Sequence, residues 1–156
     1  MPTQELTRVL DEAGVAYELV EHAHTETALA EARALGVEAS HVAKTLVVTA
    51  PDGYVRAVLP ASERIDLRKL REVHAGGKRD VHLATESELA RDFPEFELGA
   101  VPPVGGSRRD PVVLDRRLVE HDSIVLEAGT HDASVRLSPG DLVKVAAAVV
   151  GDISAD

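Results

Sequence analysis

The chain has no cysteine and no tryptophan, and it contains only two tyrosines and two phenylalanines. Without cysteine it has no disulfide framework, no thiolate nucleophile and no cysteine-bound metal. Apolar residues nevertheless make up 44% of the 156 residues, so the core must be built from Val, Leu, Ile and Ala. This composition is typical of one globular domain, which we expect to span residues 1–156, and not of a disordered chain.

Long hydrophobic runs are also missing. The longest apolar stretch, Val145 to Val150, is too short to cross a bilayer. The first ten residues lack the basic segment and apolar run of a signal peptide. We therefore expect a soluble, cytoplasmic protein that has no membrane partner.

Positive charge is scarce, because the formal net charge is -10. This disfavours DNA and non-specific nucleic-acid binding, in which Lys and Arg neutralise phosphates. Ten of the 17 Lys and Arg residues form two groups, which are either ordinary solvated surface or, if they fold onto one face, a local basic patch. The groups are Arg64, Arg68, Lys69, Arg71, Lys78 and Arg79, and then Arg108, Arg109, Arg116 and Arg117.

The order of predicted elements is not the regular strand–helix alternation of a doubly wound sheet. It predicts an α+β fold with a mixed, largely antiparallel sheet or barrel flanked by helices. Strands are expected over residues 16–20, 42–49, 54–59, 81–84, 111–114, 123–128 and 133–137. Helices are expected over residues 6–13 and from a cap at Thr25 or Thr27 to Leu35. Two more should begin after Asp66 and after the Thr85–Glu88 capping box. A last helix should begin after Ser138, with Ser138 as N-cap, Pro139 as N1 and Asp141 as N3.

Lys44 is a charged residue inside an otherwise apolar strand, residues 42–48 (VAKTLVV). A lysine on an apolar face reaches out to solvent, pairs with a carboxylate or lines a pocket, and the sequence leaves these alternatives open. The turn signal at residues 51–53 sets Lys44 opposite Leu59. Ser62 should therefore lie nearby.

A second unusual segment is Gly99-Ala100-Val101-Pro102-Pro103, inside the Pro- and Gly-rich residues 93–111. One glycine with two prolines fixes an unusual backbone path and exposes main-chain N–H and C=O groups. Such groups hold a small ligand or a water, unless the segment is only a structural turn. Long irregular segments in small domains are often functional.

Other catalytic motifs are incomplete. Seven histidines are scattered, and His22 and His24 have no third ligand at a zinc-binding spacing, so we expect no metal. Ser107 lacks the flanking glycines of a nucleophile elbow, and Gly105-Gly106 lacks the ending of a phosphate-binding P-loop. The residues therefore predict no cofactor and no side-chain nucleophile.

The lysine strand and the Gly99-x-x-x-Pro103 loop resemble two motifs of the YbaK/prolyl-tRNA-editing-domain family. Further matches follow in the family's order from about residue 20 to about residue 145. They are Glu21-His22 with Thr25, Leu59-Pro60-Ala61-Ser62, Phe93-Pro94-Glu95 and Ala128-Gly129-Thr130-His131.

This resemblance implies a trans-editing deacylase that hydrolyses the ester of a mischarged tRNA. It implies that Lys44 helps to hold the terminal adenosine and its amino acid, and that the Gly99 backbone positions water or a substrate hydroxyl. The acceptor end of an aminoacyl-tRNA and a delivering aminoacyl-tRNA synthetase would be the partners. The implied substrate-binding residues are His22, Thr25, Ser62, Pro103, Gly129, Thr130 and His131.

Glu127 departs from the family pattern, since a small or neutral polar residue is expected there. Its carboxylate would repel phosphate or pair with Lys44 if it entered the pocket, whereas strand alternation could point it away. Two other functions stay open: a non-catalytic module that binds a tRNA end, a nucleotide or a synthetase, and a small-molecule ester or amide hydrolase.

Overall fold

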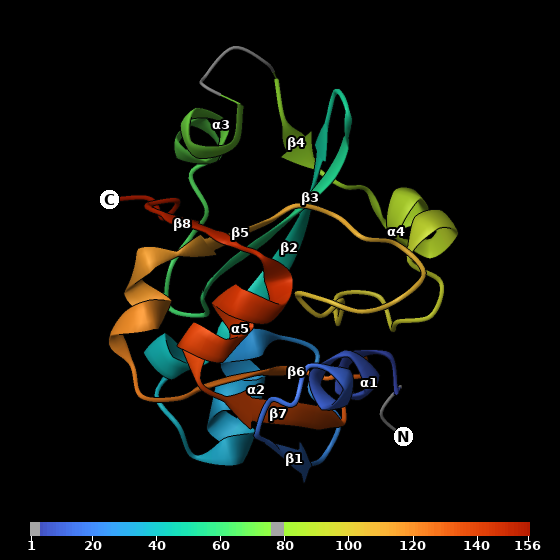
Figure 1. The fold of residues 1–156 in the computed structure, drawn as a ribbon, viewed down its shortest axis with the longest axis vertical. Helices are drawn as coiled ribbons and strands as arrows, with labels where there is room; N and C mark the ends of the chain where they lie inside the picture. Colours follow the sequence, from blue (N-terminus) through green and yellow to red (C-terminus); the bar gives the residue numbers. More distant parts are fainter. Residues whose placement is uncertain (1–3, 76–79) are drawn as a thin grey trace.

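The computed structural model describes residues 4–75 and 80–156. This part of the chain forms five α-helices, two short 3-10 helices and eight strands (Figure 1). The helices are α1 (Glu5–Glu12), α2 (Ala28–Leu35), η1 (Ala39–His41), α3 (Leu67–Ala75), α4 (Glu86–Asp92), η2 (Arg116–Glu120) and α5 (Pro139–Ala146). The strands are β1 (Tyr17–Glu21), β2 (Ala43–Ala50), β3 (Gly53–Pro60), β4 (His82–Leu83), β5 (Val112–Asp115), β6 (Ile124–Glu127), β7 (Ala133–Leu137) and β8 (Val149–Gly151).

The strands form two sheets, and the fold is α+β as predicted. An antiparallel sheet has the order β1-β7-β6, and a mixed sheet has the order β4-β2-β3-β5-β8. A single parallel bridge between Val42 and Val125 links them. In the described residues neither sheet closes on itself, so the arrangement is two open sheets and not a barrel.

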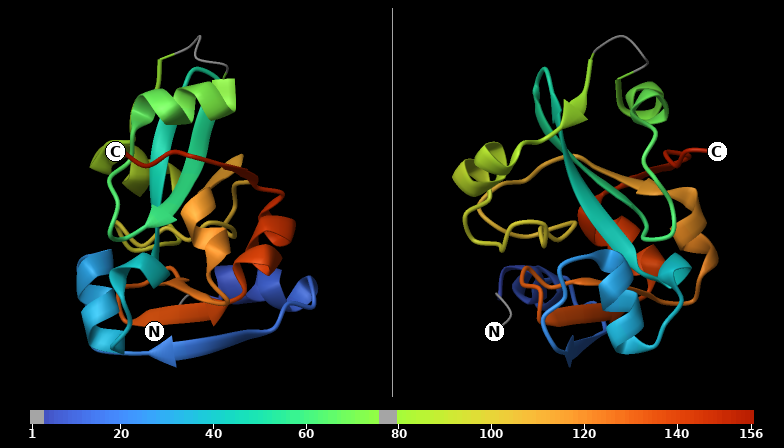
Figure 2. Two further views of the ribbon diagram at one scale, coloured as in Figure 1. Left: turned by 90° about the vertical axis from the view of Figure 1, so that its left-hand side faces the viewer. Right: turned by 180° about the vertical axis from the view of Figure 1, so that it is seen from behind.

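The β2–β3 hairpin is the long, twisted element that connects the two halves of the molecule (Figure 2). Its β-branched strands are joined at the predicted turn, and its register pairs Lys44 with Leu59, also as predicted. β3 and β5 pair in parallel, as do β5 and β8. The hairpin therefore carries Lys44 to the junction between the sheets.

The core is aliphatic, as the composition requires. The main cluster packs α1 and α5 against β5, β6 and β7, and includes fully buried Leu6, Leu114 and Leu142. A second cluster lies under α3 around Leu70. The aromatic residues Tyr54, Phe93 and Phe96 gather in a small cluster next to the irregular segment.

Local signals set most element boundaries. Thr85 and Glu88 form the predicted capping box of α4, and Gly36 ends α2 in the left-handed conformation, with φ 67°. Ser138 is the N-cap residue of α5 with Pro139 and Asp141 in the first turn, as predicted, although the Ser138 side chain makes no capping hydrogen bond. The sequence did not reveal β8, because three residues that pair in parallel with a distant strand carry no periodic signal.

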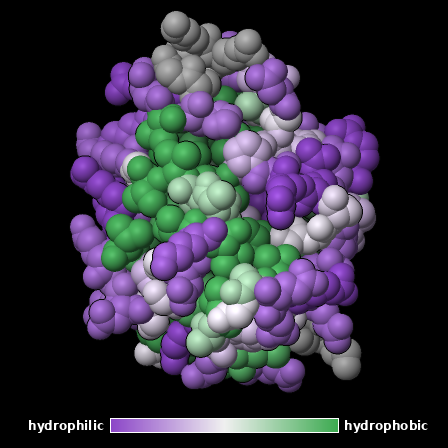
Figure 3. Space-filling view, viewed as in Figure 1, coloured by the Kyte–Doolittle hydropathy of each residue, from purple (hydrophilic) through white to green (hydrophobic). Residues whose placement is uncertain are grey.

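The face that carries α5 and β8 has a continuous apolar surface (Figure 3). Val149 and Val150 on the edge strand β8 are exposed there. None of the helices in the described part of the chain is both long and apolar enough to cross a lipid bilayer.

Candidate functional site

Lys44 lies near the start of β2 with a half-buried side chain. Its ammonium donates a hydrogen bond to the backbone carbonyl of Glu63. Burial lowers the pKa of Lys44, and the Glu63 carboxylate partly opposes this shift. Lys44 forms no ion pair with any described residue and does not extend freely into solvent. Of the three alternatives it follows the third, because it lines a cavity.

That cavity has a volume of about 140 Å³ and lies between α2, β2 and the irregular segment. Lys44 and Gly99 both line it, so the structure brings together the two residues singled out by the sequence. The complete lining is Glu26, Thr27, Ala28, Glu31, Ala43, Lys44, Thr45, Leu46, Gly99, Val101 and Glu127.

Gly99 has φ +84°, a conformation that favours glycine. Its own N–H and C=O make no hydrogen bond to any residue in the two described ranges. The loop is held from both sides of Gly99, because Ala100 N donates to Glu97 O over 2.9 Å and His131 Nε2 donates to Leu98 O over 2.7 Å. The Gly99 backbone is therefore fixed in place while its polar groups stay available.

The Gly129–His131 turn holds the Gly99 loop in place through hydrogen bonds to Glu97. Glu97 N donates to Gly129 O, and Glu97 Oε2 accepts from His131 N. His131 is almost fully buried, and a side chain at position 99 would lie 3.6 Å from its ring. The turn therefore contacts the Gly99 loop, but Gly129, Thr130 and His131, which the resemblance implies to be substrate-binding residues, lie beside the cavity and not in its wall.

Thr25 and Thr130 are buried in the same region. Thr25 N and Thr25 Oγ1 both donate to His131 O, and the Thr130 hydroxyl donates to Asp132 Oδ1. Both threonines therefore hold the turn, and neither lines the cavity.

The other residues implied by the resemblance lie further out. His22 does not line the cavity and contacts it only indirectly. His22 Nε2 is 2.9 Å from Ser134 Oγ, and the Ser134 hydroxyl donates a hydrogen bond to Glu31 in the cavity wall. Ser62 lines a separate open groove with Glu63, whose carbonyl binds Lys44. Pro103 lines a second, separate cavity.

Arg56, which was not predicted to have a role, anchors the irregular segment. It is fully buried in β3, where Nε donates to Asp110 over 3.1 Å and its other nitrogens donate to the carbonyls of Pro102 and Gly105. The signal that singled out Lys44, a charged residue inside an apolar strand, also marks Arg56 within residues 54–59.

Glu127 points into the cavity, where it meets Glu31 of α2. Its Oε2 lies 3.0 Å from His131 Nδ1, but the angle does not suit a hydrogen bond. No ion pair joins Glu127 to Lys44 in the described residues. Glu31 was missed, although it lies three residues after Ala28 and four before Leu35, on the apolar face of its helix.

Burial has a strong effect on both carboxyl groups. It raises the pKa of Glu127 to about 9, with further repulsion from Glu31, Glu97 and Glu26. It also raises the pKa of Glu31 to about 7, against a smaller opposite effect of the Ser134 hydrogen bond. The cavity thus has a cationic part at Lys44 and an acidic part at Glu31 and Glu127.

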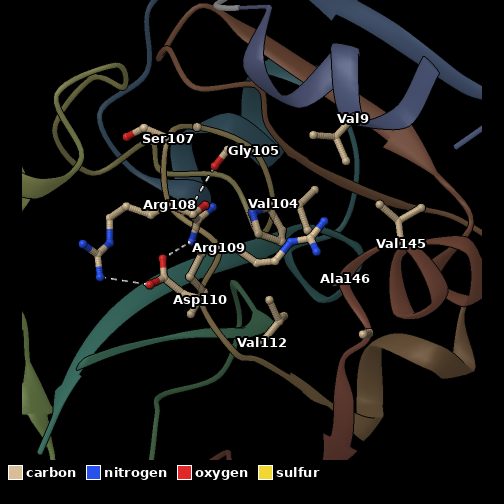
Figure 4. A pocket seen from close by; sticks show the side chains of 14 residues that line it. Val9, Val104, Gly105, Ser107, Arg108, Arg109, Asp110, Val112, Val145 and Ala146 are labelled. Atoms are coloured by element: carbon tan, nitrogen blue, oxygen red, sulfur yellow. Dashed lines mark hydrogen bonds and ion pairs between the residues drawn. The ribbon is translucent and has the colours of Figure 1, made fainter. Parts of the chain in front are cut away.

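The second cavity, of about 340 Å³, has a basic and apolar lining (Figure 4). Arg109 extends between Val104 and Ala146, whereas Arg108 turns outward to Asp110. Residues 103–110, which belong to the same irregular segment as Gly99, form much of the lining of this cavity.

Residues from both basic groups of the sequence bind the same carboxylate, that of Asp152. Lys69 and Arg117 both pair with Asp152, over 3.2 and 2.9 Å, so much of this charge is neutralised within the protein. Lys78 and Arg79 lie outside the described residues. Within residues 4–75 and 80–156, no three His, Asp or Glu side chains form a group that could hold a metal ion.

Comparison with known proteins gives consistent matches. A family model described as aminoacyl-tRNA editing domain matches residues 22–145. A protein of Enterococcus faecalis named "Putative Cys-tRNA(Pro)/Cys-tRNA(Cys) deacylase EbsC" is 28% identical over 144 residues, which cover 88% of this chain and 86% of that protein.

The names of two further matches refer to the enzyme that attaches proline to tRNA. A solved structure described as "a putative trans-editing enzyme for prolyl tRNA synthetase" has 29% sequence identity and a TM-score of 0.86, with 97% of this chain and 95% of that chain covered. The proline--tRNA ligase of Thermosipho melanesiensis is 30% identical over 97 residues, which are 62% of this chain but only 17% of the ligase.

Proposed function

Because the chain belongs to the aminoacyl-tRNA editing domain family, we propose that it is a hydrolase that removes the amino acid from a mischarged tRNA in trans. In this proposal residues 1–156 act as one editing domain in the cytoplasm. The names of the Enterococcus relative and of the structural match, a deacylase and a trans-editing enzyme, support the same reaction.

The observation that carries this proposal is the shared cavity of Lys44 and Gly99. A half-buried ammonium stabilises a developing oxyanion or a nearby phosphate more strongly than an exposed one would. The Gly99 backbone offers a donor and an acceptor without needing a titratable side chain. Together they supply electrostatic stabilisation and orientation, which suffice for water to attack an activated ester.

In the proposed reaction a water oxygen bonds to the ester carbonyl carbon and forms a tetrahedral oxyanion. Collapse of this intermediate breaks the bond to the terminal ribose oxygen. The proton lost by the water ends on that ribose oxygen, so the products are the free amino acid and a tRNA with its hydroxyl restored. Lys44 stabilises the oxyanion, and the Gly99 backbone orients the water or the neighbouring ribose hydroxyl.

The acceptor end of the tRNA is the proposed partner. The basic second cavity is lined by a later part of the irregular segment that also carries Gly99, and Arg109 offers a cation there to a phosphate of the unpaired end. With a net charge of -10 the protein offers few other phosphate contacts. We therefore propose that an aminoacyl-tRNA synthetase, such as that for proline, delivers the substrate.

A deacylation assay tests the function. The protein is incubated with a panel of tRNA(Pro) molecules charged with cysteine, alanine or proline, and release of the amino acid is compared with spontaneous hydrolysis. We expect at least one mischarged tRNA to be hydrolysed faster with wild type, and Lys44→Ala to lose about 100-fold or more of that rate.

The control variant is Glu72→Gln, which changes one exposed carboxylate on α3, away from the cavity. It should keep the full wild-type rate. Hydrolysis of simple aminoacyl-nucleotides at the same rate as charged tRNA would point to a small-molecule hydrolase. Wild-type rates no faster than spontaneous hydrolysis on every panel member would contradict an enzymatic function.

A further inference from the structure

Glu31 and Glu127 form an acidic wall in the cavity that Lys44 and Gly99 also line. The Glu31 side chain is fully buried, and that of Glu127 is 10% exposed. Glu31 Oε1 and Glu127 Oε2 have no hydrogen-bond partner in the part of the chain that the structure describes. Two buried carboxyl oxygens of residues in the wall of one small cavity therefore lack a hydrogen bond, and one of them, Glu127 Oε2, contacts only His131 Nδ1 over 3.0 Å.

An unpaired buried carboxyl oxygen is costly to a folded protein. Neither of these two oxygen atoms has a hydrogen bond within the described residues. The neighbouring His131 touches Glu127 but at an angle that makes no hydrogen bond, and His24 stacks edge-on against His131, at 5.3 Å between ring centres. The nearby Glu26 and Glu97 add negative charge around Glu127.

The lining of the same cavity also includes the positively charged side chain of Lys44. The Lys44 ammonium is bound to Glu63 O, and no described ion pair connects it to either buried carboxylate. A ligand that complements this cavity must carry a negative or electron-rich group at one end and a hydrogen-bond-donating cation at the other. Esterified amino acids on tRNA have this arrangement, with the ester carbonyl and terminal phosphate on one side and the α-ammonium group one carbon away from the ester.

We propose that Glu31 and Glu127 bind the α-ammonium group of the esterified amino acid. An ammonium group has three N–H donors, and the two carboxyl groups present two acceptor atoms that lack a hydrogen bond. The role rests on the proposed deacylase function and adds a specificity determinant to it: the site selects acyl groups that carry a free amino group. The raised pKa values of both carboxyl groups agree with a site that lacks its cation until substrate arrives.

The test compares two esters that differ in one group. The first is the panel tRNA that wild type hydrolyses fastest, and the second is the same tRNA esterified with the α-hydroxy acid of the same side chain. Hydroxyl replaces ammonium with little change in size, so a steric effect is avoided. Because the two esters differ in intrinsic reactivity, the measured quantity is the ratio of their kcat/KM values, compared between variants.

We expect Glu127→Gln and Glu31→Gln each to lower the ratio of amino ester to hydroxy ester by about tenfold relative to wild type, since hydrogen bonds to a charged group are the strong ones. Lys44→Ala should slow both esters and leave the ratio unchanged, and Glu72→Gln should change neither. A variant that merely misfolds would slow both esters alike, and its far-ultraviolet circular dichroism would reveal it.

The outcomes separate the two ideas. Hydrolysis of both esters by wild type, with the same ratio in both glutamine variants, would overturn the ammonium site and leave the deacylase function intact. Failure of wild type to hydrolyse any charged tRNA would overturn both. A ratio that falls in the two glutamine variants alone supports the site.

Discussion

Replacing Glu127 by glutamine should remove a large part of the pH dependence of stability. Burial raises the pKa of Glu127 from its ordinary value near 4.5 to about 9. Between these values the folded protein holds a proton that the unfolded chain has released. Raising the pH therefore favours unfolding, and wild type loses stability as the pH rises through this window.

The magnitude follows from linkage. One carboxyl group whose proton is bound only in the folded state changes the free energy of unfolding by at most about 1.4 kcal/mol per pH unit. From pH 6 to pH 8 the loss is at most about 3 kcal/mol, and for a chain of this length about 1 kcal/mol shifts the Tm by roughly 2–4 °C. The wild-type Tm should fall by about 5–10 °C more than that of Glu127→Gln over this range.

Thermal unfolding followed by circular dichroism at both pH values measures this difference. The glutamine amide fills nearly the same space as the neutral carboxyl group but does not titrate, and Glu31 titrates in both proteins, so its effect cancels in the comparison. Glu72→Gln on the exposed face of α3 should follow the wild-type curve. Equal Tm losses in wild type and Glu127→Gln would refute the conclusion that this carboxyl group is protonated in the folded state.

Four further predictions concern the site and its support. Lys44→Arg should be nearly as inactive in deacylation as Lys44→Ala, because a planar guanidinium does not replace a compact ammonium, and both variants should keep the wild-type Tm to within a few degrees. Gly99→Ala should lose activity and about 1–3 kcal/mol of stability in urea unfolding, since alanine is strained at a φ of +84°; an unchanged midpoint would mean that the loop relaxes. Arg56→Met should cost about 3–5 kcal/mol in the same assay, because it leaves buried Asp110 with only the more exposed Arg108 as a partner and removes the donors to the carbonyls of Pro102 and Gly105. Full stability would refute the anchoring role. Binding of tRNA by the protein alone should be weak and only modestly reduced by salt in filter-binding titrations, whereas a steep salt dependence would reveal many phosphate contacts.

The sequence by itself determined the local elements. The β-branched run and the turn at residues 51–53 fix the β2–β3 hairpin and the pairing of Lys44 with Leu59. The Thr85–Glu88 capping box fixes the start of α4. These features depend on residues a few positions apart, so their physical causes can be read directly from the chain.

The tertiary structure decided which residues share the cavity. Lys44 and Gly99 are 55 positions apart, and their meeting in one wall was expected only from a family resemblance. The parallel strand β8, the anchoring bonds of Arg56 and the paired burial of Glu31 and Glu127 were not foreseen. Each of these features arises from contacts between distant segments. The sequence places Arg56 and Glu31 at apolar positions, but no local periodicity encodes which groups pack over them.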